Sequence, residues 1–366
     1  MRGKVNSRKV TPKRKPSPVA RVVRAVDALR RGKAVVIRGD RPITILAVET
    51  ASDATLKQFV TKGRTFLLLT HARARTLKIR LYTNDAVALP IELGTTAHDL
   101  RAIADPTEDL AYPLKGPFET VREALPATFP RSIRLAKLAG LLPATIARRG
   151  AQAGAVEINA ADIAAYDDEV VRTLNIVTRA RVPLEGAEKA ELVAFRAEDG
   201  SPEHYAIVIN APPTGKPVLT RMHSECFTGD LLGSLKCDCG SQLRGAIEAI
   251  SKAGGGVLLY LAQEGRGIGL INKLRAYRLQ DQGFDTIEAN ERLGFEADER
   301  LYGIAARMLK LLGYKSVRLL TNNPDKVAGL KAAGVKIVSR VRHVFPENEH
   351  NHAYLKAKAE KAGHLF

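Results

Sequence analysis

All three cysteines of this chain lie close together, as Cys226, Cys237 and Cys239 in the spacing Cys-x10-Cys-x-Cys. Thiolates are soft ligands, and zinc is the metal they usually bind inside cells. Three protein ligands leave a fourth position for water, which is typical of catalytic rather than structural zinc. The alternative is three buried thiols that pack as small hydrophobic residues, although Lys236 and Asp238 are unusual neighbours for a core. The spacing therefore predicts a zinc site.

Composition restricts the class of protein. Hydrophobic residues make up 45% of the chain and charged residues 26%, as in soluble globular proteins. No apolar run reaches the ~20 residues of a membrane-spanning helix, and we expect neither a disulfide framework nor a secretory signal, hence a cytoplasmic protein. The formal charge of +18 favours an anionic partner. The absence of Trp and the 5% aromatic content argue against a protein that stacks single-stranded bases.

The length of 366 residues predicts two domains. Residues 1–18 hold seven basic side chains, no acidic ones and three prolines, which is typical of a disordered basic tail. This tail carries +7 of the net charge, so nucleic acid becomes a less favoured partner. In residues 19–177 helical and strand patterns alternate, which predicts an α/β domain. Residues 178–366 read as β-rich at first and α/β afterwards, so the fold class is mixed α/β (α+β) with two domains.

Hydrophobic periodicity places the expected elements. In the first domain we expect a helix at 19–31, strands at 34–37, 43–48 and 65–70, and a helix at 132–142. In the second domain we expect an antiparallel meander of strands at 191–196, 204–209 and 218–223. Further elements are helices at 242–253, 268–282, 299–312 and 324–333, and strands at 257–262 and 317–321.

The strand that runs into Cys226 carries polar side chains on one face. Side chains alternate across a strand, so Arg221, His223 and Glu225 share a side. A charged, solvated face is the simplest explanation of such a row. Because the row ends at a predicted metal ligand, we favour a role in the site.

Two strand-to-helix junctions are candidate phosphate sites. Residues 263–269, Gln-Glu-Gly-Arg-Gly-Ile-Gly, could present backbone N–H groups to an anion, although they match neither the dinucleotide fingerprint nor the P-loop. Arg266 could bind phosphate, and Glu264 could accept from the N–H edge of a guanine-like base. In residues 321–326, Asn323 suits the helix cap and Lys326 lies in the first turn, where a bound phosphate would offset its charge. A plain turn and an ordinary capped helix remain the alternatives. We interpret His343, His350 and His352 as a polar loop rather than a metal site.

Arg221–Asp230 and Ser234–Gly240 closely resemble GTP cyclohydrolase II, and the resemblance extends over roughly residues 180–366. It implies an enzyme of riboflavin synthesis that uses Zn2+ and Mg2+, opens the imidazole ring of GTP at C8 and releases formate and pyrophosphate. The implied product is 2,5-diamino-6-(5-phospho-ribosylamino)pyrimidin-4-one, and the implied assembly is a homodimer. Further matching segments are Gln263–Leu270, Asn272–Asp285, Ala297–Arg300, Leu319–Lys326 and Tyr354–Leu365.

The resemblance also implies roles for individual residues. Cys226, Cys237 and Cys239 match the zinc ligands. Asp298 matches a proton acceptor, and Tyr277 a residue that orients the reacting base or its water. Arg300 matches a nucleophile toward the α-phosphate; because a guanidinium stays protonated, we expect it to bind phosphate rather than attack. The GTP-contacting positions are matched by Arg221, Met222, His223, Ser224, Glu225, Gln242, Glu264, Gly265, Arg266, Thr286, Thr321 and Lys326.

The first domain faintly resembles 3,4-dihydroxy-2-butanone-4-phosphate synthase, for example at Gly32–Ile37 and Leu135–Leu141. That family places an acidic metal-binding cluster after its first strand, where this chain has Arg38–Pro42. Its later His-Thr-Glu is replaced by Thr128–Pro130. Without carboxylates a divalent metal has no hard oxygen ligands. We therefore predict a degenerate synthase-like domain that keeps the fold and has lost the activity.

Two other functions stay open at this stage. A cyclohydrolase-like paralogue could form a different product or accept another purine. A regulatory protein could use the basic tail and an inert nucleotide pocket.

Overall fold

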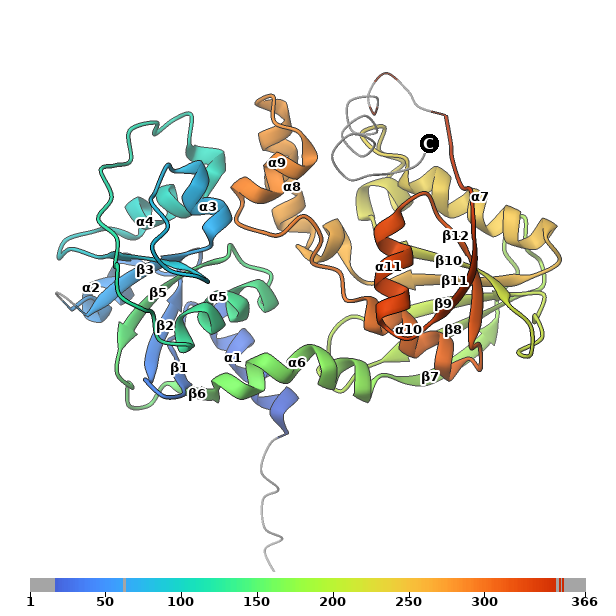
Figure 1. The fold of residues 1–366 in the computed structure, drawn as a ribbon, viewed down its shortest axis with the longest axis horizontal. Helices are drawn as coiled ribbons and strands as arrows, with labels where there is room; N and C mark the ends of the chain where they lie inside the picture. The colour runs from blue at the N-terminus through green and yellow to red at the C-terminus, as the bar shows by residue number, and fades with distance from the viewer. Residues whose placement is uncertain (1–16, 62–63, 347–348, 350, 352–366) are drawn as a thin grey trace, which may run out of the picture.

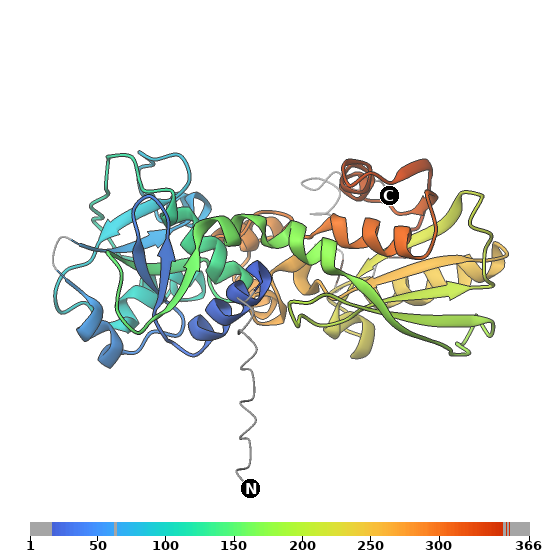
Figure 2. The same ribbon diagram turned by 90° about the horizontal axis from the view of Figure 1, so that it is seen from below.

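The computed structural model describes residues 17–61, 64–346, 349 and 351. Most of the basic tail, His350, His352 and the Tyr354–Leu365 segment lie outside the described residues. Two lobes, each built on one β-sheet, are joined by helix α6 (Ala160–Thr173) (Figures 1 and 2). The predicted mixed α/β fold with two domains is confirmed.

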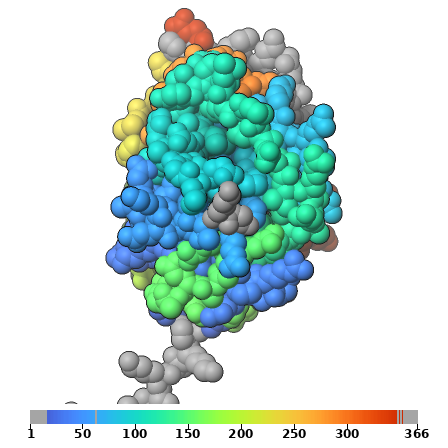
Figure 3. All heavy atoms as spheres, turned by 90° about the vertical axis from the view of Figure 1, so that its left-hand side faces the viewer, coloured from blue at the N-terminus to red at the C-terminus, as the bar shows by residue number. Residues whose placement is uncertain are grey.

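The first lobe contains a six-stranded sheet in the order β4-β3-β5-β2-β1-β6. Only β1 and β6 pair in parallel. Both faces of the sheet are covered by buried apolar side chains, so β2 and β3 are buried along their whole length. Figure 3 looks onto the outer end of this lobe. Its strands are β1 (Val35–Arg38), β2 (Ile43–Ala47), β3 (Thr65–Leu69), β4 (Val87–Pro90), β5 (Ala144–Arg149) and β6 (Val156–Asn159), and its helices are α1 (Pro18–Arg30), α2 (Asp53–Phe59), α3 (His71–Thr76), α4 (Ala97–Ala104), the 3-10 turn η1 (Pro106–Glu108) and α5 (Thr128–Leu138).

The expected first helix and three early strands are confirmed. Gly32, which follows α1, has φ +67°, and a Cβ there would lie 2.6 Å from the carbonyl oxygen of Thr50. Helix α5 was expected at 132–142 but spans Thr128–Leu138. It ends early because Gly140 adopts φ +68°, the left-handed conformation that terminates helices.

The second lobe contains a seven-stranded sheet in the order β13-β12-β10-β11-β9-β8-β7. The expected meander is right for β8 and β9 and wrong for the third strand, β10, which pairs in parallel with β11 and β12. The reason is that helix α7 (Cys239–Lys252) crosses over between β10 and β11, and such a crossover returns the chain in the same direction. The strands are β7 (Asn175–Arg181), β8 (Ala190–Arg196), β9 (His204–Ile209), β10 (Val218–Ser224), β11 (Gly256–Leu261), β12 (Ser316–Leu320) and β13 (Lys336–Val341).

Several boundaries differ from expectation in this lobe. Strand β7 of the second sheet spans Asn175–Arg181, so it runs across the domain boundary expected after residue 177. Helix α8 begins at Leu270 rather than 268 because the preceding turn contains positive φ angles. Helix α10 begins at Tyr302, so Arg300 precedes it instead of lying on it. Helix α9, whose N-terminus has a capping box of Asp285 and Glu288, and strand β13 were not predicted. The remaining elements are the π-helical turn η2 (Phe227–Leu231), α7 (Cys239–Lys252), the 3-10 turn η3 (Glu264–Gly267), α8 (Leu270–Asp281), α9 (Thr286–Arg292), α10 (Tyr302–Leu311) and α11 (Pro324–Ala332).

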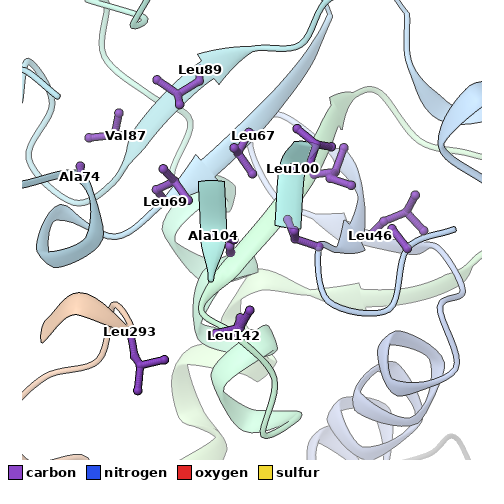
Figure 4. Close-up of a cluster of buried hydrophobic side chains, with 14 of the residues drawn as sticks. Leu46, Leu67, Leu69, Ala74, Val87, Leu89, Leu100, Ala104, Leu142 and Leu293 are labelled. Atoms are coloured by element: carbon purple, nitrogen blue, oxygen red, sulfur yellow. The ribbon is translucent and has the colours of Figure 1, made fainter. Parts of the chain in front are cut away.

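Helices α8 and α9 leave the second lobe and pack on the first (Figure 1). Leu279 of α8, together with Leu293 and Phe295 after α9, joins a buried cluster that includes Leu100 and Leu142 (Figure 4). In sequence these helices belong to the second half of the chain, whereas their apolar side chains complete the core of the first lobe. Among the described helices, none has the length and apolarity needed to cross a bilayer.

Candidate functional site

The three thiols converge at one end of the second sheet. Their sulfur atoms all lie within 4.8 Å of one another, and the Cys226 and Cys237 sulfurs are 3.8 Å apart. Cys226 follows strand β10, and Cys239 begins helix α7. Gly229 of η2 passes directly beneath the cluster, because a Cβ there would lie 2.7 Å from the Cys237 sulfur and 3.0 Å from the Cys226 sulfur. The prediction that the cysteines meet in space is confirmed.

The donor set fits a zinc ion. Two thiolates bound at 2.3 Å to a tetrahedral ion stand about 3.8 Å apart, which agrees with the separation of Cys226 and Cys237. Hydrogen bonds from Cys237 and Cys239, together with the ammonium group of Lys273, lower the pKa of the Cys226 thiol. Among the described residues, this trio is the one group of His, Cys, Asp or Glu found with a geometry suited to a metal.

Strand β10 presents polar side chains toward the thiols, as its alternation predicted. Arg221 and His223 are buried and line a cavity at the end of the strand, whereas the side chain of Met222 lies on the other face in the hydrophobic core. His223 Nε2 lies 3.1 Å from both carboxylate oxygens of Asp230, and its ring stacks on Tyr260. Burial lowers the pKa of His223, and it lowers that of Arg221 to about 10.

Three polar atoms of this strand are buried without a hydrogen-bond partner in the described part of the chain. They are Arg221 Nε, His223 Nδ1 and Ser224 Oγ. Buried polar groups are nearly always hydrogen-bonded in folded proteins. Three unpaired polar atoms on one strand therefore indicate a place where a ligand supplies the missing partners. Glu225 continues this lining, and burial raises the pKa of its carboxyl group.

The glycine-rich junction forms the turn η3 after strand β11. Gly265 and Arg266 both have φ near +61°, a conformation that L side chains rarely adopt. The Glu264 carboxylate accepts hydrogen bonds from the Phe227 backbone N–H at 2.6 Å and from Lys273 at 2.8 Å. Glu264 therefore holds the thiol-bearing loop, while Arg266 lines the cavity with its head group partly exposed.

Lys273 is the functional candidate that sequence reasoning missed. Its Nζ lies 3.0 Å from the Cys226 sulfur and 3.1 Å from Thr228 Oγ1. Tyr277, one helical turn further along α8, places its hydroxyl 3.4 Å from the same Thr228 oxygen. The signal was available, because residues four apart on a helix share a face and Tyr277 was already a candidate.

Arg300 reaches the cavity and Asp298 stands behind it. The Asp298 carboxylate accepts from Arg300 Nε at 2.8 Å and Nη2 at 2.6 Å, and from the Tyr302 hydroxyl at 2.7 Å. Burial opposes ionisation of Asp298, but the Arg300 guanidinium outweighs it and lowers the pKa of the carboxyl group. Of these residues only Arg300 is among those that line the cavity.

The junction after strand β12 forms the remaining wall of the cavity. The Asn323 side chain accepts from the Asp325 N–H at 2.7 Å, which confirms the predicted cap. Lys326 is buried, and its ammonium donates to the carbonyl of Met222 at 2.8 Å. His343 is also buried, with Nε2 2.9 Å from the Gln242 carbonyl oxygen, so it belongs to packing near the site rather than to a metal cluster.

The predicted site residues come together with two exceptions. Met222 faces the core and Asp298 lies behind Arg300, and neither lines the cavity. The cavity is lined by the predicted residues Arg221, His223, Ser224, Glu225, Cys226, Cys237, Cys239, Gln242, Glu264, Gly265, Arg266, Tyr277, Thr286, Arg300, Thr321 and Lys326, and also by Ile268, Lys273, Ala276, Gln280, Asn290, Asn322 and Asn323.

In the first lobe, the turn after β1 is the place where the synthase family has its acidic metal-binding cluster. The Arg38–Pro42 turn meets the start of α5, where Thr128 Oγ1 donates to the Arg41 carbonyl at 3.0 Å and its methyl group fills the space beside Gly39. The two segments singled out from the sequence thus lie together. In the residues that the structure describes, no acidic cluster with metal-binding geometry accompanies them.

Comparison with known proteins defines the family. The GTP cyclohydrolase II family model matches residues 175–342. Over 367 aligned residues, which cover 94% of this chain and 94% of the other, the chain is 48% identical to GTP cyclohydrolase-2 of Azospirillum brasilense. The chain belongs to the GTP cyclohydrolase II family. Its membership confirms the resemblance found in the second half and makes the chain a member of a hydrolase family of riboflavin biosynthesis.

Other relatives of this GTP cyclohydrolase II family member match unequal parts of the chain. Riboflavin biosynthesis protein RibBA of Bacillus cereus is 59% identical over 164 residues, which are 45% of this chain and 41% of that protein. The solved structure of RibBX, a two-domain 3,4-dihydroxy-2-butanone 4-phosphate synthase from A. baumannii, aligns with 87% of this chain and 99% of its own, at 17% identity and a TM-score of 0.32.

Proposed function

We propose that this chain hydrolyses GTP to 2,5-diamino-6-(5-phospho-ribosylamino)pyrimidin-4-one, formate and pyrophosphate, with zinc held by Cys226, Cys237 and Cys239. The observation that carries the proposal is the convergence of three thiols and three orphaned polar atoms of β10 on one cavity. Zinc bound there would supply an activated water at neutral pH. The family membership supports the same reaction.

The cations around the cavity suit the triphosphate. Arg221, Arg266, Arg300 and Lys326 approach it from four different segments, so a chain of three phosphates can be contacted along its length. Guanidinium groups bind phosphate oxygens in pairs and stay protonated, which favours phosphate binding over a nucleophilic role for Arg300. Mg2+ would accompany the phosphates rather than occupy a protein cage.

Two carboxylates and one phenol remain for the purine. Because Glu264 already holds Phe227 and Lys273, Glu225 is the acidic side chain better placed to accept from the N–H edge of guanine. Burial raises the pKa of Tyr277, so its hydroxyl keeps its proton at neutral pH and can donate to the reacting end of the substrate. Asp298 acts in this proposal by holding Arg300 in its orientation.

The decisive test follows GTP consumption, formate and pyrophosphate with purified protein, before and after a zinc chelator. We expect both products in equal amounts, loss of activity on chelation and recovery when zinc is restored. Binding of GTP without turnover would instead indicate a nucleotide-binding regulator, and retention of formate in the product would indicate a paralogue that stops at the formamido stage. Light scattering of the same sample tests for the homodimer that the family resemblance implies.

We further propose that the first lobe has no 3,4-dihydroxy-2-butanone-4-phosphate synthase activity. The replacement of the acidic segment by Arg38–Pro42 and the closure of that region by Thr128 support this proposal. Incubation of the protein with ribulose 5-phosphate and Mg2+ should yield no dihydroxybutanone phosphate. Product above the level of a no-protein blank would contradict the proposal.

A further inference from the structure

Helix α8 has two functional faces. Lys273 and Tyr277 point toward the thiol loop, as described above. Asn272 and Arg275, on the opposite side, contact the first lobe. The fully buried Asn272 donates to the Gly140 carbonyl at 3.2 Å, and Arg275 makes an ion pair of 3.1 Å with Glu49. The same helix therefore touches both lobes through side chains that are neighbours in sequence.

The Glu49–Arg275 pair is well enclosed. Both side chains are less than one-fifth exposed, and Glu49 also accepts from the backbone N–H of Leu142 at 2.8 Å. Arg275 makes a second contact of 3.3 Å with Asp105 and donates to Asn272 at 2.7 Å. Partly buried pairs with additional hydrogen bonds hold a fixed geometry, and breaking one partner leaves an uncompensated charge.

A second ion pair between the lobes contacts the segment that carries Arg300. Lys137 of α5 donates to the Glu299 carboxylate, and Arg134 lies 3.9 Å from the same group. Glu299 stands between Asp298 and Arg300, and its backbone N–H donates to the Arg266 carbonyl at 3.1 Å. The first lobe thus contacts the segment that carries Arg300, and this segment is hydrogen-bonded in turn to the carbonyl of Arg266 in η3.

The apolar contact of α8 and α9 with the first lobe, called the seam below, makes the two ion pairs part of a hydrophobic core. Ile268, Ala276 and Leu279 are buried in the cluster that also contains Leu46 and Leu142 of the first lobe. Figure 4 shows these two leucines within the cluster. Without the first lobe this face of α8 would be exposed to water. Helix α8 is therefore held by the first lobe on one side and by the thiol-bearing loop and η3 on the other.

We propose that the first lobe is a positioning scaffold for the reaction of the second, acting through Glu49 on α8 and through Lys137 on the Asp298–Arg300 segment. This inference rests on the proposed function. Both are positioning residues, because neither lines the cavity. Displacement of a reacting group by about 1 Å can reduce turnover up to a hundredfold, so loosening either tie should lower kcat. The GTP KM should change less than kcat, since Arg221 and Lys326, two of the four proposed phosphate-binding cations, are held by the second sheet.

The experiment compares Glu49→Gln and Lys137→Met in the full-length chain with Glu157→Gln, which removes an exposed charge of the first lobe remote from α8. We expect kcat to fall about tenfold in the first two variants, with KM within twofold, and to stay unchanged in the control. Lys137→Arg, which keeps the charge, should recover most of the activity. Unchanged kcat in both Glu49→Gln and Lys137→Met would overturn the proposal.

Amide hydrogen exchange provides a readout that needs no turnover. In Glu49→Gln, exchange in residues 270–281 should accelerate several-fold, while β10 and β11 keep the wild-type rate. Equal acceleration in all of these elements, or loss of bound zinc, would show a general loss of structure and overturn the positioning role. If wild-type protein releases no formate, the proposed function fails, while this exchange measurement still decides whether Glu49 controls α8.

Discussion

The two sheets of this protein carry similar cores and very different edges. In the second sheet, β10, β11 and β12 run in parallel, and the thiols, Glu264 and Thr321 all follow the carboxyl ends of these strands. Open α/β sheets bind ligands at that edge. In the first sheet the turn after β1 meets α5 through Thr128 and the Arg41 carbonyl, which close the space. The first lobe therefore has a complete hydrophobic core at positions that are separate from the residues at its sheet edge, so the core does not depend on what the edge can bind.

The largest effect should come from breaking the thiol cluster. Cys237→Ser replaces a soft ligand with a weakly binding hydroxyl, so bound zinc should fall to a small fraction and formate release should drop about a thousandfold or more. Elemental analysis and the formate assay measure both. Ser234→Ala in the same loop is the matched control. Wild-type turnover by a zinc-free Cys237→Ser protein would refute the contrast between a chemical and a structural lobe.

A smaller effect is expected at the edge of the same cavity. Arg300→Lys keeps the positive charge but loses the paired hydrogen bonds, so kcat/KM for GTP should fall roughly a hundredfold, about 2.7 kcal/mol. Arg318→Lys, on the exposed side of β12, provides the comparison. If the two variants behaved alike, Arg300 would not be a phosphate ligand, and the geometry with Asp298 would be structural.

The seam can be tested through stability. Leu293→Ala removes a buried side chain from the cluster that spans both lobes and should lower the free energy of unfolding by about 2–4 kcal/mol. The affected unit should be the first lobe, as followed by hydrogen exchange in β3 and β5. Val338→Ala, at a half-exposed position of β13, should cost far less. Loss confined to the second sheet would show that α9 is not part of the core of the first.

Local patterns predicted most of the site, and non-local pairing explains what they missed. Alternation placed Arg221 and His223 on one side of a strand, although it also meant that Met222 had to face the core. Helix α11 and its cap followed from Asn323 and the residue after it, since capping is decided within one turn. The parallel pairing of β10 could not be read from its own residues, which would suit either direction.

The contact between the lobes could not be predicted from the sequence for a related reason. Apolar residues at 276, 279 and 293 indicate burial, but periodicity does not say against which sheet they are buried. The positive φ of Arg266 was equally hidden, because arginine has no preference for this conformation and the residue that bonds the Arg266 carbonyl, Glu299, is far away in sequence. Sequence fixes local geometry well and the choice of partner poorly.

We expect acid to lower the stability of the second lobe before that of the first, because the second lobe contains the buried His204. This buried histidine accepts a hydrogen bond at Nδ1 from the Ala262 N–H, and burial lowers its pKa to about 4. Between pH 6.5 and 4 the unfolded state binds a proton that the folded state does not, so the second lobe should lose stability as pH falls, by up to about 3 kcal/mol. In the first lobe, burial of Asp109 opposes ionisation, but Arg73 and Lys115 outweigh it and keep the pKa of that carboxyl below its usual value.

The stabilisation from Asp109 is therefore lost only below about pH 4. Denaturant unfolding at pH 7, 5 and 4 should show the second lobe weakening first. His204→Gln keeps the acceptor without the titration, so it should reduce the dependence between pH 6.5 and 4. Part of the dependence should remain, because burial also lowers the pKa of His343 in the same lobe to about 4. The exposed His98→Gln is the control. If the first lobe weakened first, or if His204→Gln kept the wild-type slope, the second lobe's sensitivity to acid would have another source, and the difference between the lobes would be confined to their edges.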